Sequence, residues 1–149
     1  MLPILVALTL GVVDGARIFA AQISLANGVR EAAIFGGSPT GAKAWCPAAL
    51  PNPYIVCPGS SLTGQSGQTM ADRIVGEAHG LTLPGITLAT PVCTNSAGVA
   101  VTCTDVTATT VKVSATYRMS LHLTALPVIG AIWPNPVVMT SSTTAAILR

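Results

Sequence analysis

The chain has 149 residues, of which 50% are hydrophobic and only 8% charged, with a formal net charge of +2. This charge content is far below the usual level of about a quarter, and a mean hydropathy of +0.65 excludes a typical highly charged cytosolic domain. No run of Lys or Arg exists to follow a phosphate backbone, so we expect no nucleic acid partner. A composition rich in Ser, Thr, Gly and Pro favours an exported or polymerised surface over a cytosolic enzyme.

The first 35 residues predict one long apolar helix, in which Asp14 and Arg17 are the first charged residues. Because the helix has no wide polar face, it must lie in a bilayer or among copies of itself. A helix over residues 2–35 is about 50 Å long at ~1.5 Å per residue, which exceeds the ~30 Å hydrocarbon core of a bilayer. Its last turns, which carry Arg30 and Glu31, are therefore expected to project into water.

Two features inside this helix have alternative interpretations. Asp14 and Arg17 are three residues apart and share a helix face, so they form either a passive pair or a device that sets the register between subunits. Gly11 and Gly15 form a small-xxx-small pair, which either allows another helix to approach or merely fills the helix. The apolar pattern continues after Asp14 without a clean cleavage site, so a retained helix is favoured over a secretory signal.

The helix is expected to end near Gly36 and to drive self-association through residues 2–26, so a chain starting near Ser38 should be a soluble monomer. The candidate assembly residues are Leu2, Pro3, Leu5, Leu8, Gly11, Val12, Asp14, Gly15, Arg17, Ile18, Phe19 and Ile23. This divides the chain into an N-terminal assembly or membrane helix, residues 1–36, and a globular domain, residues 37–149.

The first half of the globular domain is predicted to be a loop followed by a short helix. Residues 38–67 are rich in Pro, Gly and Ser, which opposes regular structure. Residues 68–80 have the spacing of an amphipathic helix. The polar residues of that helix could resemble an acid-base cluster, but we interpret them as its solvated face; they are Asp72, Arg73, Glu77 and His79.

From residue 83 onward the hydrophobic period becomes two, which predicts strands at 83–93, 98–103 and 109–123. The third strand has the clearest alternation, and His122 near its end is expected to face solvent. A final strand at 137–139 or 145–148 is also predicted. The apolar face of the third strand comprises Val111, Val113, Ala115, Tyr117, Met119 and Leu121, and the polar face comprises Lys112, Ser114, Thr116, Arg118, Ser120 and His122.

The four cysteines follow the apolar helix and, in an exported chain, predict two disulfides rather than free thiols or a zinc site. Among three connectivities, close spacing favours Cys46 with Cys57 and Cys93 with Cys103. No C-x-x-C pair is present, and no G-x-S-x-G, Walker, H-E-x-x-H or Rossmann pattern occurs. We therefore expect no metal, no cofactor and no enzymatic activity.

The N-terminal helix also carries an ordered motif. Pro3 is followed by G-V-V-D-G-A-R-I-F at residues 11–19, by Gln22, and by N-G-V-R-E-A-A at residues 27–33. In order and spacing this motif resembles the N-terminal signature of TadE/TadF-like pseudopilins, relatives of type IV pilins from tight-adherence systems. That signature is an apolar run containing proline, then roughly G-I-V-E-F-G-R-x-F, a Gln, and x-N-x-A-R-E-G-A.

The motif departs from the family pattern at several positions. Pilins usually carry a glutamate at the fifth mature position, where this chain has Leu5, so either the mature N-terminus lies before Met1 or processing differs. The other departures are Asp14 for Glu, Gly15 and Ala16 for Phe and Gly, and Ala32 for Gly.

The resemblance implies an α+β, pilin-like fold: a long N-terminal hydrophobic helix followed by a small disulfide-stapled antiparallel β domain. It implies a structural subunit of an extracellular cell-surface filament, a helical homopolymer of identical subunits that serves attachment or surface colonisation. Before assembly the helix would lie in the membrane, with a prepilin-type peptidase and inner-membrane pilus assembly machinery as partners. The alternatives are a membrane-anchored minor pseudopilin that primes a filament of another protein, and a signal-anchored monomeric binding domain or adhesin.

Overall fold

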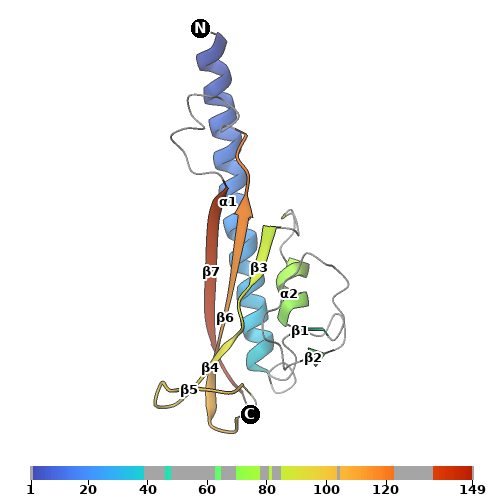
Figure 1. Cartoon of the computed structure of the whole chain (residues 1–149), viewed down its shortest axis with the longest axis vertical. Coiled ribbons are helices and arrows are strands. Elements are labelled where there is room, and N and C mark those ends of the chain that lie inside the picture. The colour runs from blue at the N-terminus through green and yellow to red at the C-terminus, as the bar shows by residue number, and fades with distance from the viewer. Residues whose placement is uncertain are drawn as a thin grey trace.

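The structure is a computed structural model that describes residues 2–38, 46–47, 63–64, 70–77, 81, 85–103, 105–122 and 136–148. Helix α1 (Leu2–Gly37) runs along the molecule, and its N-terminal half extends beyond an antiparallel sheet, as Figure 1 shows. Helix α2 (Met70–Glu77) packs against α1. The predicted α+β class and the long apolar helix are confirmed.

Strand β6 (Ala108–Met119) is the centre of the sheet and confirms the strand predicted at 109–123. Its apolar face is buried from Val111 to Met119, whereas Lys112 and Arg118 on the other face are exposed. Because side chains alternate across a strand, the period of two in the sequence predicts which face packs on the core.

The strand predicted at 83–93 is divided in two. Strands β3 (Ile86–Leu88) and β4 (Val92–Asn95) both pair antiparallel with β6. Leu88 lies opposite Ala115, and Val92 lies opposite Lys112. The segment between Leu88 and Val92 is therefore one residue longer than the segment of β6 between their partners. This bulge contains Pro91, which has no N–H to donate to a ladder.

The hairpin after β4 confirms one of the two predicted disulfides. Strand β5 (Ala100–Val101) is shorter than the predicted strand at 98–103, and the turn before it places Gly98 at a φ of 76°, a conformation that favours glycine. Cys93 and Cys103 are joined, with a Cα–Cα distance of 5.1 Å. By closing a loop of about a dozen residues, this bond contributes about 2–3 kcal/mol. The other predicted bond, Cys46 to Cys57, stays a prediction, because Cys57 lies outside the described residues.

Strand β7 (Val137–Ala146) is longer than either predicted final strand and joins the two. It pairs antiparallel with β6 along its whole length, from Val137 opposite Met119 to Ala146 opposite Thr110. The middle of β7, residues 140–144, is a run of Thr and Ser without apolar alternation. Thr fits a pleated, half-buried surface well, so pairing with β6 makes this run a strand where periodicity could not identify it.

Within the segment predicted to be a loop, strand β1 (Cys46–Pro47) pairs in parallel with β2 (Thr63–Gly64). This two-residue pair is more regular structure than the prolines led us to expect; the rest of that segment lies outside the described residues. Pro47 is the last residue of β1, and proline is tolerated at a sheet edge, where its missing N–H is not required.

The predicted helix at 68–80 is confirmed at its centre as α2. Arg73 and Glu77 are exposed, as expected for a solvated face, and the Arg73 guanidinium lies 5.1 Å from the centre of the Phe35 ring. The side chain of Asp72 and the whole of His79 lie outside the described residues. Contact between a cation and an aromatic face stabilises the α1–α2 packing modestly.

The C-terminal half of α1 belongs to the core of the domain, although we expected its last turns to project into water. Arg30 is exposed, but Leu25 and Val29 on the opposite face are fully buried against α2 and the sheet. The last turn of α1 is also tied to the end of the chain, because the Leu148 N–H donates to the Gly37 carbonyl at 2.7 Å. This tie and the buried side chains make α1 part of the domain fold.

We expect Gly28→Ala to lower the free energy of unfolding by about 1–2 kcal/mol, because α2 approaches α1 too closely for a side chain there. A Cβ at Gly28 would lie 2.8 Å from the backbone carbonyl oxygen of Ile74. The control is Gly15→Ala in the same helix, where no heavy atom lies within 4 Å of the new Cβ. Alanine there should raise stability by up to ~1 kcal/mol. Unfolding of both variants in the same detergent measures the difference, and equal changes would contradict the close packing.

Candidate assembly helix and its polar network

Over residues 14–37 helix α1 has one face in the domain and one face bare, whereas no side chain of residues 4–13 is buried. The bare face forms a stripe whose members recur every three, four or seven residues and therefore lie on one side of the helix. Val12 is 73% exposed and Phe19 is 70% exposed. We call this set the outer apolar stripe; it comprises Leu5, Leu8, Val12, Phe19 and Ile23.

The opposite face of α1 is directed at the sheet and at α2. Asp14, Ala21 and Leu25 are buried on this side at the same helical spacing. Asp14 therefore points toward its own domain, and the outer apolar stripe points away from it.

The other predicted assembly residues are distributed between these faces. Gly15 and Arg17 are exposed, whereas Gly11 and Ile18 are half-buried, and Ile18 packs against the core. A Cβ at Gly11 or Gly15 would meet nothing within 4 Å, so this small-residue surface is open within the subunit. Leu2 and Pro3 lie in the first turn of α1, but their side chains lie outside the description. The role of all these residues in assembly stays a prediction.

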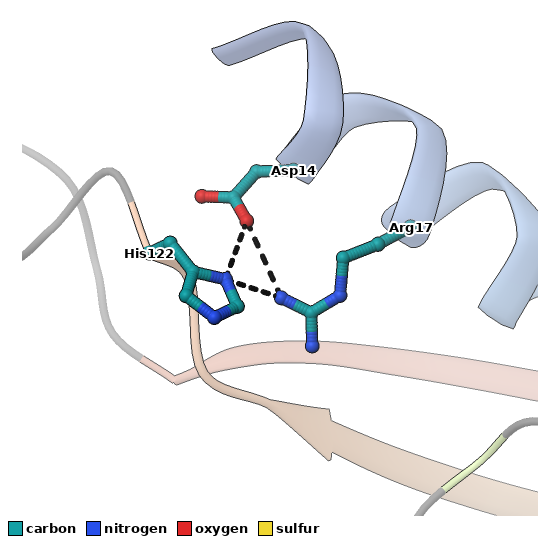
Figure 2. A network of polar contacts seen from close by, with 3 residues as sticks. All are labelled: Asp14, Arg17 and His122. Atoms are coloured by element: carbon teal, nitrogen blue, oxygen red, sulfur yellow. Dashed lines mark hydrogen bonds and ion pairs between the residues drawn. The ribbon is translucent and has the colours of Figure 1, made fainter. Parts of the chain in front are cut away.

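The structure adds a third member to the Asp14–Arg17 pair. Arg17 Nη1 lies 3.4 Å from Asp14 Oδ1, so the predicted intrahelical pair is present. His122, just after β6, places Nδ1 3.2 Å from the same oxygen and 2.5 Å from Arg17 Nη1. Figure 2 shows these side chains converging between helix and sheet.

The guanidinium of Arg17 has donors and no acceptor, and it meets both Asp14 Oδ1 and His122 Nδ1. Arg17 is the shared donor, and it links the buried carboxylate of Asp14 to the end of the sheet.

Burial makes Asp14 the anchor of the network. Its side chain is 4% exposed, compared with 42% for Arg17 and 63% for His122. Asp14 is the one charged or polar residue that is buried in the described part of the chain. A buried carboxylate is costly unless hydrogen bonds satisfy it, so these contacts hold α1 in a defined rotation against the sheet.

Sequence reasoning missed the contact of His122 with this pair. We expected His122 to face solvent, and most of its side chain does, but its Nδ1 edge reaches residues more than 100 positions earlier in the chain. A local sequence pattern cannot reveal a contact between residues so far apart in the chain. The described residues contain no cluster of three or more His, Cys, Asp or Glu that could hold a metal ion.

Comparison with known protein families matches the N-terminal part of the chain. Residues 1–33 match the family model described as TadE-like protein, and neither a curated protein nor a solved structure matches the chain. The matched segment contains the outer apolar stripe, Asp14 and Arg17, but neither His122 nor any strand. The resemblance expected from the N-terminal motif is thereby confirmed over this segment. Residues 1–33 are therefore a TadE-like segment, consistent with a TadE-like pseudopilin.

Proposed function

We propose that this chain is a structural subunit of an extracellular pilus-like filament and polymerises through α1. The TadE-like match links the chain to tight-adherence pili and supports a structural rather than an enzymatic role. Attachment or surface colonisation is the proposed purpose of the filament. Its assembly would use a prepilin-type peptidase and an inner-membrane assembly platform.

The observation that carries this proposal is the outer apolar stripe. Five large side chains on one side of α1, between Leu5 and Ile23, face away from the domain. Complete burial of such a side chain is worth about 1.5–3 kcal/mol, so exposure of the whole stripe to water is strongly unfavourable. A bilayer or the helices of neighbouring subunits would remove the stripe from water.

Both environments suit α1 at different stages. By length and composition α1 can cross a membrane, with a mean hydropathy of 1.9 in its most apolar part. Before assembly the membrane would hold the subunit through this helix. Hydrocarbon chains are as apolar as the stripe, so a filament must replace them with close helix packing, which the open surface at Gly11 and Gly15 would permit.

Substitution of the outer apolar stripe tests the proposal. We expect Phe19→Asp to abolish filaments without unfolding the domain, because a carboxylate among packed apolar helices is left without a partner. The matched control is Val106→Asp: Val106 is also a large exposed apolar residue, at 80%, but it belongs to the connection between β5 and β6 and not to α1. Electron microscopy of purified material measures polymerisation, and circular dichroism checks the fold.

Three outcomes count against the proposal. Filaments of normal length from Phe19→Asp would show that polymerisation does not depend on the outer apolar stripe. Equal loss from Val106→Asp would show that the assay reports general damage. If the wild-type chain forms filaments only together with another protein, the chain is a minor pseudopilin and not a homopolymer.

A further inference from the structure

A pocket of about 440 Å³ opens at the end of the sheet that faces the bare part of α1. At this end β3 begins, β6 ends and β7 begins, so the pocket lies among the ends of three neighbouring strands. Arg17 contributes the side from α1. The described residues that line the pocket are Arg17, Gly85, Tyr117, Arg118, Met119, Ser120, His122 and Pro136.

The chemistry of this pocket favours an anion. Two arginines, Arg17 from α1 and Arg118 from the exposed face of β6, line it together with Ser120 and His122, and none of its described lining residues is acidic. The Asp14 carboxylate, which pairs with Arg17, offsets part of the Arg17 charge. Arg118 is exposed and has no ion pair among the described residues, so its charge is available to a ligand. Planar guanidinium groups bind phosphate oxygens in a bidentate manner.

The position of the pocket identifies the source of the anion. Residues 2–13 of α1 carry no charge, and charge first appears at Asp14 and Arg17, beside the pocket. If the charge-free part, about 18 Å long at ~1.5 Å per residue, penetrates the ~30 Å hydrocarbon core from one side, the pocket lies at that face of the bilayer, where lipid phosphates begin. Arg residues near an anionic membrane surface each contribute about 1 kcal/mol to its attraction.

We propose that this pocket binds the phosphate of an anionic lipid headgroup while the subunit is held in the membrane. The inference rests on the membrane stage of the proposed function. The lipid contact would set the depth of the domain above the bilayer, because Arg118 is attached to the sheet and Arg17 to the helix. Release of the lipid would accompany the transfer of α1 into the filament.

The test compares lipid affinities of the full chain in nonionic detergent micelles. Native mass spectrometry with added phosphatidylglycerol and phosphatidylcholine measures how strongly each lipid is retained. The wild-type chain should retain phosphatidylglycerol about fivefold more strongly, and Arg118→Gln should remove most of this preference. The matched control is Lys112→Gln, because Lys112 is also an exposed cation on β6 but lies six residues, about 20 Å, from Arg118.

Each outcome decides the assignment. Loss in Arg118→Gln but not in Lys112→Gln supports it, whereas equal retention of the two lipids, or equal loss in both variants, overturns it. Displacement of phosphatidylglycerol by excess inorganic phosphate would show that the pocket takes a free anion, and would overturn the lipid source. Filament formation is measured separately, so a wild-type chain that binds lipid but never polymerises would count against the proposed function alone.

Discussion

A chain that begins at Ser38 is expected to be unfolded, although the sequence had led us to expect a soluble monomer. The deletion removes Leu25 and Val29, which are fully buried against α2 and the sheet, together with the Gly37 carbonyl that accepts from Leu148. Loss of each large core side chain costs about 2–5 kcal/mol, and the whole stability of a domain is about 5–15 kcal/mol. Near-ultraviolet circular dichroism and dispersion of amide resonances measure the loss of packing.

The matched truncation is a chain that begins at Val13. It lacks Leu5, Leu8 and Val12 of the outer apolar stripe but keeps every buried residue of α1 from Asp14 onward. We expect this chain to fold, to be more soluble and to form no filaments. A cooperative unfolding transition in the chain that begins at Ser38 would contradict the assignment of α1 to the core.

Asp14→Ala is expected to prevent filament assembly while it weakens the free subunit only modestly. In the free subunit Arg17 and His122 are 42% and 63% exposed, so water solvates them when the carboxylate is lost, and the cost is about 1 kcal/mol. When neighbouring helices surround α1, Arg17 loses this water and stands uncompensated at about 3–5 kcal/mol. Thermal unfolding measures the first effect, and imaging of filaments measures the second.

The double variant Asp14→Leu with Arg17→Leu separates two roles for the pair. It removes both charges and leaves no unpaired ion, so a passive pair predicts recovered filaments with unchanged subunit spacing. A register device predicts filaments of altered or variable symmetry. The buried orientation of Asp14 toward its own domain favours the passive role. Normal assembly by Asp14→Ala alone would contradict both.

Sequence patterns predicted those parts of the fold that depend on local periodicity. The run of apolar residues predicted α1, alternation predicted the buried face of β6, and close spacing predicted the Cys93–Cys103 bond. In each case the physical cause acts within a few residues: helical pitch, strand pleat or the short reach of a disulfide. The TadE-like motif belongs to this group, because it lies entirely within α1.

Partners far apart in the chain could not be predicted in this way. The polar middle of β7 becomes a strand because it pairs with β6, and Pro91 divides β3 from β4 by a bulge whose position depends on that same pairing. His122 meets Asp14 only because β6 ends beside α1. None of these contacts can be recognised from the hydrophobic periodicity of the residues that make it.

The amino-acid sequence by itself determined that this protein has a membrane-length apolar helix, a small β domain and a charged pair inside the helix. Only the tertiary structure decided which side of that helix the domain covers. The packing of α2, β6 and β7 against α1 buries Asp14 and Leu25 and leaves Val12 and Phe19 bare. A helix that is apolar on every side has no preferred buried face, so contacts with distant elements determine which of its faces is buried. Because of this packing, the outer apolar stripe faces the membrane or the neighbouring subunits that we propose as its partners.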